Sequence, residues 1–322
     1  MHTLQRPITA DEIAAYNNAG VVCLRGVLDL NAVNFLRKNI DEAVNTLGNS
    51  PSGYDLTELT HAYEAVDDKT LAERSSGQHN VSAVVEHMRA SGKPLLFDQV
   101  SEDKKGRFLL DTGVASRIRA LRTFILRGAA VDIASALLQS DTVRFFGDQI
   151  FVKEPGTRER TAFHQDATYF PINGNQCCVL WIPVDPATLE TGAMRYVRGS
   201  HSDGTLYSPN VFVSQTALPG SEGVQVPDID ANPQGYDLVH FDAEPGDIIV
   251  HHYRTVHGAG GNTSRYQVRR ALSVRYTGDD IRFTNRPWAP PQPHHSHNLK
   301  EGDPLDASDF PVVSRASRRQ AA

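Results

Sequence analysis

The spacing of apolar residues divides the chain into a helical first part and a β-rich second part. In residues 29–47 apolar side chains recur every three or four positions, which predicts an amphipathic helix. Thr9 and Glu12 have the spacing of a capping box, so a shorter helix is expected to begin there and to end at Gly20. Residues 80–90 and 116–140 also have helical patterns, the second of them interrupted at Gly128. Residues 49–115 as a whole give no clear pattern.

Short apolar runs separated by Gly, Pro, Asp and Asn dominate the chain after residue 140. Examples are "TVRFFGDQIFVKEPG", "QCCVLWIPVDP", "DLVHFDAEPGDIIVHH" and "RRALSVRY". Such runs are typical of β-strands, and an earlier one, "VVCLRGVL", follows the first helix. Helices followed by short strands indicate an α+β chain with a mainly β core, built as a sandwich or barrel. We expect a single domain over 1–322, with a helix-rich part (1–140), a β core (141–290) and an irregular, Pro-rich tail (291–322).

Composition excludes several classes of partner. The chain of 322 residues has a formal net charge of -6, which argues against nucleic acid or an anionic membrane surface. No apolar run approaches the roughly 20 residues of a membrane helix, and the first residues lack a secretory-signal layout. Three cysteines form no disulfide framework, so a cytoplasmic protein is expected. A small-molecule substrate is the expected partner, and a homo-oligomer remains compatible with the sequence.

The stretch "TAFHQDATYF" contains the first candidate metal ligands. His164 and Asp166 are two residues apart, so on a strand both would project from the same face. Burying a carboxylate beside an imidazole is costly unless a cation pairs with them, and a divalent metal ion does this. The two-histidine, one-carboxylate triad of non-haem iron enzymes requires one further histidine.

The candidates for that histidine lie in "EPGDIIVHHYRTVHGAGGN". The glycines after His257 would allow the backbone to approach a site closely. His257 is favoured because a strongly basic strand, "RYQVRRALSVRY", follows it at a distance suited to an adjacent anchor. His251 and His252 compete with it, although they also read as ordinary strand residues, one on each face. His201 is expected to make structural hydrogen bonds near a turn. The "PHHSH" cluster (293–297) is either a surface metal site or, more often for such sequences, a polar tail.

Taken in order, the motifs resemble those of the phytanoyl-CoA dioxygenase family of iron(II)/2-oxoglutarate oxygenases. The resemblance rests on "ITADEIAAYNNAGVVCLRGVL", "FVKEPGTRERTAFHQDATYFP", "CVLWIPVDPATLETGAMRYVRGSH" and "PGDIIVHHYRTVHGAGGNTS", and it covers most of residues 8–276. It implies a double-stranded β-helix, a jelly-roll barrel like that of the cupins, with N-terminal helices packed on one sheet.

The resemblance also implies a set of site residues. The iron ligands fall on His164, Asp166 and His257. The arginine that binds the distal carboxylate of 2-oxoglutarate falls on Arg269, and a tryptophan that lines the cosubstrate site falls on Trp181. Fe(II), 2-oxoglutarate and O2 are therefore the expected cofactor and cosubstrates.

Some positions depart from the family pattern. Positions on the preceding strand that carry polar cosubstrate contacts in some relatives are Ile150 and Val152 here, and a serine after the distal histidine is Ala259. The implied cosubstrate site therefore depends more heavily on Arg269 and the metal.

The implied reaction releases succinate and CO2 and hydroxylates an unactivated C–H bond of a small metabolite. Related halogenases have a small residue in place of the carboxylate ligand, so Asp166 indicates hydroxylation. The alternatives are a cupin-like metalloenzyme that does not use 2-oxoglutarate and a catalytically silent jelly-roll binding protein. Substrate-facing candidates are Asp148, Gln165 and Tyr169, and the sequence does not identify the substrate.

Alternation along "RRALSVRY" assigns the two adjacent arginines to opposite faces. Arg269 shares its face with Ala271 and Ser273, which are small enough to line a crowded interior. Arg270 shares the apolar face and is expected to reach the helix layer, its charge meeting solvent or a carboxylate. The alternative is that both are surface residues and that the anchor is elsewhere, at Arg265 or Arg275.

Overall fold

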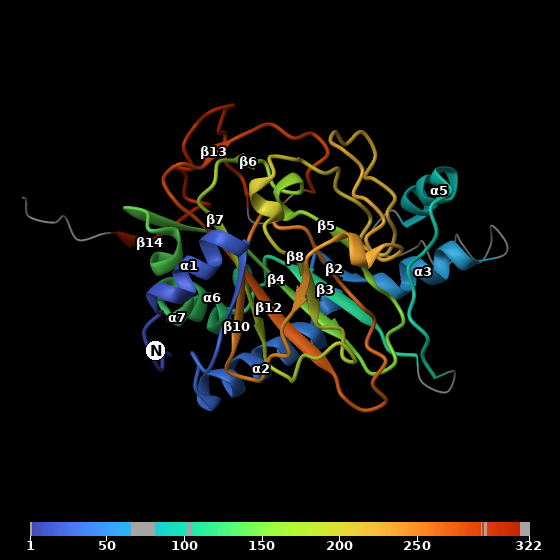
Figure 1. Cartoon of the computed structure of the whole chain (residues 1–322), viewed down its shortest axis with the longest axis horizontal. Helices are drawn as coiled ribbons and strands as arrows, with labels where there is room; N and C mark the ends of the chain where they lie inside the picture. Colours follow the sequence, from blue (N-terminus) through green and yellow to red (C-terminus); the bar gives the residue numbers. More distant parts are fainter. Residues whose placement is uncertain (1, 66–80, 102–104, 291, 293–294, 316–322) are drawn as a thin grey trace, which may run out of the picture.

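A computed structural model describes residues 2–65, 81–101, 105–290, 292 and 295–315, in which two antiparallel sheets face each other as a double-stranded β-helix (Figure 1). The large sheet has the order β1 (Val21–Leu24), β10 (Ile248–His252), β7 (Cys177–Pro183), β12 (Arg269–Thr277), β4 (Thr142–Lys153), β3 (Phe108–Thr112) and β2 (Gly53–Asp55). The second sheet has the order β5 (Thr161–His164), β11 (His257–Ala259), β8 (Met194–Val197) and β9 (Leu238–His240). A two-stranded ribbon pairs β6 (Ile172–Asn173) with β13 (Arg282–Phe283). The predicted fold class is confirmed.

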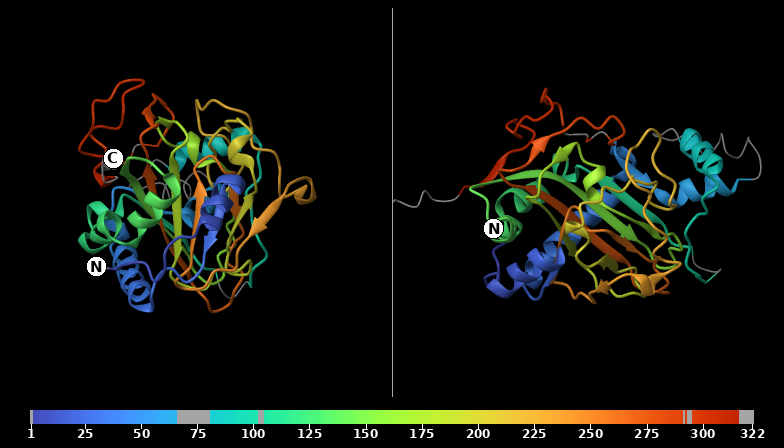
Figure 2. Two further views of the ribbon diagram at one scale, coloured as in Figure 1. Left: turned by 60° about the vertical axis from the view of Figure 1, so that its left-hand side comes forward. Right: turned by 45° about the horizontal axis from the view of Figure 1, so that its top comes forward.

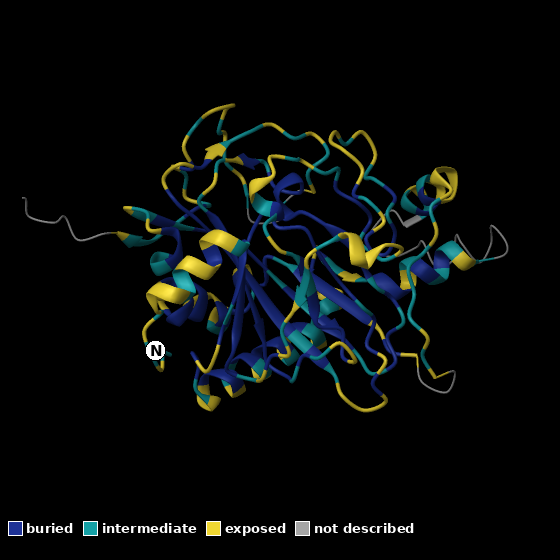
Figure 3. Cartoon of the chain, in the orientation of Figure 1, coloured by how far each residue is buried: buried dark blue, intermediate teal, exposed yellow. Residues whose placement is uncertain are grey.

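Four helices cover the outer face of the large sheet (Figure 2). They are α1 (Ala10–Ala19), α2 (Leu30–Asn45), α6 (Arg119–Arg127) and α7 (Ala129–Leu138). Two others, α3 (Leu56–Glu64) and α5 (Val81–Ser91), pack on each other beside β3, away from this layer (Figure 1). The buried residues gather where helices and sheet meet and between the two sheets (Figure 3).

Strand alternation decides which side chains face the helices and which face the second sheet. On β12, Leu272, Val274 and Tyr276 join the core between sheet and helices. The neighbouring positions on the other face pack toward the second sheet. There Ala271 lies in one hydrophobic cluster with Trp181 of β7 and Tyr196 of β8. The interior between the sheets is therefore reached by the odd-numbered residues of β12.

The signals at the helix ends act as predicted. The Glu12 backbone N–H donates to Thr9 Oγ1 (3.2 Å), and the Thr9 N–H donates to a Glu12 carboxylate oxygen (2.9 Å), which completes the capping box. Gly20 closes the helix in the left-handed conformation (φ 72°), where glycine is favoured. Gly128 separates α6 from α7, and a Cβ there would lie 2.6 Å from the Phe124 carbonyl oxygen.

The C-terminal tail is more regular than the sequence suggested. β14 (Val312–Arg315) pairs with β4 at residues 142–144. β4 has twelve residues and β3 covers only its last five, so the start of β4 offers a free edge that β14 fills. Of the "PHHSH" cluster, His295 packs on Phe146 and Phe310, whereas His294 lies outside the described residues. The expectation of an irregular tail is therefore wrong for residues 312–315.

None of the helices in the described ranges is both long enough and apolar enough to cross a lipid bilayer.

Candidate active site

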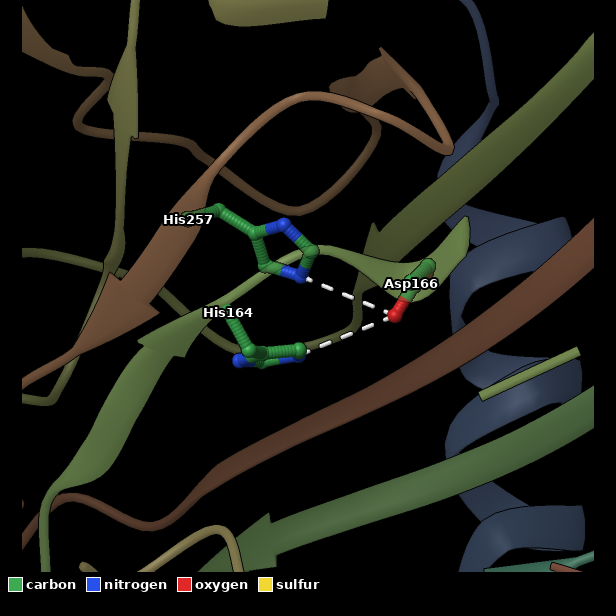
Figure 4. Close-up of side chains that lie close together, drawn as sticks. All are labelled: His164, Asp166 and His257. Carbon is green, nitrogen blue, oxygen red and sulfur yellow. Dashed lines mark ion pairs between the residues drawn. The ribbon is translucent and has the colours of Figure 1, made fainter. Parts of the chain in front are cut away.

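Two neighbouring strands of the second sheet bring three polar side chains together (Figure 4). His164 on β5 and His257 on β11 are directly paired, and Asp166 follows β5 by two residues. The Nε2 atoms of His164 and His257 lie 3.7 and 3.9 Å from Asp166 Oδ1. All three side chains are buried. Their ligand atoms lie within 4.8 Å of one another, close enough to share one ion at about 2 Å from each.

The local backbone differs from the expectation of one continuous strand. β5 ends at His164, and Asp166 begins a single 3-10 turn, Asp166–Thr168. The turn nevertheless directs the carboxylate to the two imidazoles. The i, i+2 argument therefore identified the right pair, although only the first residue lies on a strand.

Both histidines are held with Nε2 toward the site. The Nδ1 atom of His164 lies 2.8 Å from the Ala162 carbonyl oxygen, and that of His257 lies 2.8 Å from the Thr255 carbonyl oxygen. A carbonyl oxygen only accepts, so Nδ1 carries the proton and donates in each case. The Nε2 lone pairs are left facing Asp166, which is the arrangement of metal-ligating histidines.

The ionisation states suit metal binding. Burial raises the pKa of Asp166, but the hydrogen bonds that the imidazoles of His164 and His251 can offer in the absence of a metal ion, together with the charges of His257 and Arg275, outweigh burial and hold this pKa well below its usual range. Burial, helped by His164 and His251, lowers the pKa of His257 well below its usual value. An ionised carboxylate and a neutral imidazole are the forms that bind a divalent cation.

His251 is a fourth histidine at this site. It is buried, its Nε2 atom lies 3.7 Å from Asp166 Oδ2, and neither ring nitrogen has a hydrogen-bond partner. His252, the next residue, faces away and its Nε2 lies 2.7 Å from the Asn175 carbonyl oxygen. The expectation of one histidine on each face is correct. The interpretation of both as ordinary strand residues is wrong for His251, which lies against the oxygen of Asp166 that His164 and His257 do not approach.

A pocket between the sheets continues from the triad. It is lined by Phe108, Phe151, Thr161, His164, Asp166, Trp181, Met194, Phe212, His251, His257, Arg269, Ser273 and Arg275. Among these described lining residues, only Phe151 and Phe212 are not buried, and their rings stack with centroids 6.3 Å apart. The pocket therefore approaches solvent on the side of these two rings.

Arg269 lies inside this pocket without an anionic partner. Its side chain is buried beside Trp181, with the guanidinium carbon 5.6 Å from the ring centroid. Its Nε atom has no hydrogen-bond partner, and within the described part of the chain it makes no ion pair. Burial lowers the pKa of Arg269 to about 10, although Asp185 and Tyr196 act in the opposite direction. Since an unpaired buried charge is costly, this guanidinium fits an anionic ligand such as a carboxylate.

Arg270 contrasts with its neighbour. It forms ion pairs of 2.7 Å with Asp185 and with Asp41 of α2. The two arginines therefore face opposite ways, as strand alternation predicts, and of these two Arg269 is the one that a ligand in the pocket can reach.

The expectation for β4 must be corrected. Ile150 and Val152 belong to the core between sheet and helices, because the register pairs them with Leu272 and Arg270 on the outer face of β12. The residues of β4 that face the interior lie one position away. Phe151 lines the pocket, and Gln149 accepts a hydrogen bond from Arg275 (2.8 Å). An apolar residue at 150 or 152 therefore says nothing about cosubstrate binding in this chain.

The same register corrects the prediction for Asp148. It pairs with Val274 on the outer face of β12, and its carboxylate accepts a hydrogen bond from the Ala115 N–H (3.0 Å) beneath the helices. Asp148 therefore does not line the pocket, and the prediction of a substrate contact is wrong.

Gln165 and Tyr169 hold a loop in place beside the site. Gln165 donates to the Thr205 carbonyl oxygen (3.0 Å) and accepts from the Tyr207 N–H (3.2 Å), so it points away from the pocket. The Tyr169 hydroxyl donates to the Asn210 carbonyl oxygen (2.7 Å), and its ring meets the His164 ring edge-on at 5.5 Å. Neither residue lines the pocket, so their positions do not favour a direct contact with the substrate.

Phe212 was missed by the sequence analysis. It lines the pocket with its ring 5.0 Å from that of His164, and its φ of 55° lies in the left-handed region that non-glycine residues seldom adopt. Strained backbone of this kind concentrates at functional sites. The surrounding sequence "NVFVSQ" contains no signal for this conformation.

Asp148 gives a prediction about stability. Burial raises the pKa of Asp148 to about 6, whereas the usual unfolded value is about 4. The native state therefore binds the proton of Asp148 more tightly than the unfolded state does. This binding contributes to the free energy of unfolding below pH 4, and the contribution is lost as the pH rises through 6. Between pH 4 and pH 7 the unfolding free energy of the wild-type protein should fall by about 2 kcal/mol relative to that of Asp148→Asn. Urea unfolding of both proteins at the two pH values measures this difference, and a difference that does not change with pH contradicts it.

The sequence model of the phytanoyl-CoA dioxygenase family matches residues 16–271, most of the chain. The chain belongs to the phytanoyl-CoA dioxygenase family. A "Probable phytanoyl-CoA dioxygenase" of Caenorhabditis elegans is 28% identical over 128 residues, and this match spans only 39% of either protein. A 1-deoxypentalenic acid 11-beta-hydroxylase of Streptomyces arenae is 25% identical over 77% of this chain and 73% of the relative. Together with the folded site, this family assignment identifies an oxidoreductase that uses Fe(II) and 2-oxoglutarate.

A solved structure agrees with the fold. The non-heme alpha ketoglutarate dependent carbocyclase SnoK from nogalamycin biosynthesis superposes with a TM-score of 0.61 at 23% identity, covering 97% of this chain and 99% of SnoK. The fold of SnoK thus extends over almost all of this chain. Its pocket holds the donors that the cofactors require: two oriented Nε2 atoms, an ionised carboxylate and an unpaired guanidinium.

Proposed function

We propose that this protein hydroxylates an unactivated C–H bond of a small-molecule metabolite. Each turnover would consume one O2 and one 2-oxoglutarate and would release one alcohol product, one succinate and one CO2. The observation that supports this most is the buried triad, in which two Nε2 lone pairs converge on one ionised carboxylate. A family relative named as a hydroxylase supports the same reaction type.

The proposal gives each residue a separate role. His164, Asp166 and His257 hold Fe(II), which when bound supplies the redox chemistry that couples oxidation of 2-oxoglutarate to oxidation of the substrate. Arg269 binds the distal carboxylate of 2-oxoglutarate through its planar fork, with Trp181 packed beside it. His251 is placed to donate a hydrogen bond to Asp166 Oδ2 and so to fix the orientation of the carboxylate.

The walls of the pocket protect the reaction from water. Phe108 and Met194 are buried, and the stacked rings of Phe151 and Phe212 stand where the pocket approaches solvent. Exclusion of water strengthens the charge interactions inside the site and limits side reactions.

The reaction type is tested by product mass with isotopically labelled O2 and added chloride. Asp166 supplies a carboxylate ligand, so the product should gain one labelled oxygen atom and no chlorine. A chlorinated product, or one that has lost two hydrogens without gaining oxygen, contradicts hydroxylation. Asp166→Gly should lose hydroxylation and need not gain chlorination.

A further inference from the structure

Arg275 is a second buried arginine in the pocket. It lies six residues after Arg269 on the same face of β12 and lines the pocket beside the triad. Six strand residues separate the two Cα atoms by roughly 20 Å. The guanidinium of Arg275 lies over the Phe170 ring, 5.3 Å from its centroid, whereas that of Arg269 lies by Trp181. The two cations therefore occupy different ends of the pocket.

Arg275 lacks the partner that a buried guanidinium requires. Its one described side-chain hydrogen bond is to Gln149 Oε1, an uncharged acceptor, and its Nε atom has no partner. Over the residues that the structure describes it forms no ion pair. Asp148 lies on the other face of the sheet, and Asp166 faces three imidazoles. The charges of these two carboxylates only partly offset the burial that lowers the pKa of Arg275. An incompletely compensated buried charge is costly, so such a group fits a site that receives an anion.

The formal charges of the site with Fe(II) and 2-oxoglutarate bound also favour an anionic substrate. Fe(II), the Asp166 carboxylate, the two carboxylates of 2-oxoglutarate and Arg269 together are neutral. Arg275 then adds one positive charge that neither the metal nor the cosubstrate balances. Asp148 acts on Arg275 only from the opposite face of the sheet, so one negative charge on the substrate would be the first to pair with this guanidinium directly inside the pocket.

The side on which a substrate would enter is aromatic. Phe151 and Phe212 are the partly exposed lining residues, and Gln149, the hydrogen-bond partner of Arg275, is also partly exposed. An apolar molecule with one anionic end could pack against the rings while that end reaches Arg275.

We propose that Arg275, supported by Gln149, binds a carboxylate of the substrate, so that the substrate is an apolar molecule with a single carboxylate. This inference rests on the proposed function and deepens it. Arg275 acts as a specificity-determining residue: its guanidinium offers two parallel N–H donors to the carboxylate, and the triad faces the apolar body.

The test compares carboxylic acids with their primary amides, which have nearly the same shape but no charge. A panel of aliphatic, alicyclic and aromatic acids, each with its amide, is titrated calorimetrically into the protein loaded with Fe(II) and 2-oxoglutarate in the absence of O2. At least one acid should bind the wild-type protein at least tenfold more tightly than its amide. Arg275→Gln should abolish this preference, and Arg275→Lys should keep part of it because the charge remains.

Arg270→Gln is the matched control. It removes a guanidinium from the adjacent position on β12, where the side chain pairs with Asp185 and Asp41 outside the pocket. The acid preference should persist in this variant. In Arg275→Gln the Kd for 2-oxoglutarate should stay within about twofold of the wild-type value, which also shows that the variant is folded.

Three results overturn the inference. The first is that no acid of the panel binds the wild-type protein more tightly than its amide, and the absence of any binding counts as this result. Another is an unchanged acid preference in Arg275→Gln. The third is a tenfold loss of 2-oxoglutarate affinity in that variant, which would assign Arg275 to the cosubstrate. Because binding is measured without O2, the inference can fail while 2-oxoglutarate turnover stands. Absence of iron-dependent succinate release from the wild-type protein contradicts the proposed function instead.

Discussion

Replacing His257 with alanine is expected to reduce iron-dependent turnover of 2-oxoglutarate by orders of magnitude. The same result is expected for His164→Ala and Asp166→Ala, because each removes one of three ligands that converge from β5 and β11. Loss of a direct ligand should exceed the roughly 10–100-fold effect of changing an outer partner. Succinate release with saturating 2-oxoglutarate measures turnover, and iron content after anaerobic reconstitution measures binding separately.

His251 and His252 provide the controls for this prediction. His252→Ala changes a neighbour that faces away from the pocket, so turnover should remain close to that of the wild-type protein. His251→Ala removes the group beside Asp166 Oδ2 and should weaken iron binding by roughly 10–100-fold. If His257→Ala retained activity while His251→Ala abolished it, the third ligand would be His251.

Replacing Arg269 with alanine is expected to raise the KM for 2-oxoglutarate at least tenfold. The change removes the buried guanidinium beside Trp181, and a charged hydrogen-bonded pair contributes about 1.5–3 kcal/mol. Initial rates of succinate release at varied 2-oxoglutarate concentration give the KM.

Arg270→Ala is the matched change on the opposite face. It should leave this KM nearly unchanged and lower the Tm, because it breaks the ion pairs with Asp185 and Asp41 and leaves the largely buried Asp185 with a weaker partner, Arg37 at 3.3 Å. The reverse pattern, in which Arg270→Ala raises the KM for 2-oxoglutarate and Arg269→Ala does not, would show that Arg270 and not Arg269 binds the cosubstrate.

The sequence was most informative where a rule of spacing acts on one element. Thr9 and Glu12 predicted a helix start because a capping box involves only neighbouring backbone groups. Alternation along β12 assigned Arg269 and Arg270 to opposite faces because successive side chains of a strand point to opposite sides of the sheet. The barrel itself, and the pairing of His257 with His164, came from the resemblance, since no local pattern predicts which strands meet.

The errors arise from contacts between distant segments. Alternation holds within β4, but which of its faces meets the pocket depends on pairing with β12, so Asp148, Ile150 and Val152 were assigned to the wrong side. Gln149 and Arg275 are 126 positions apart, and their hydrogen bond follows from the same register. Phe212 lies in a loop whose conformation depends on Asn210 and Ala162, and short sequence patterns do not encode such contacts.

The most direct test of the site is a crystal structure of the protein soaked anaerobically with Mn(II) and 2-oxoglutarate, with the metal located by its anomalous scattering. We expect one metal peak bound to the Nε2 atoms of His164 and His257 and to a carboxylate oxygen of Asp166, with the distal carboxylate of 2-oxoglutarate on Arg269. A metal bound through His251 in place of His257, or a distal carboxylate on Arg275 instead of Arg269, would contradict the account.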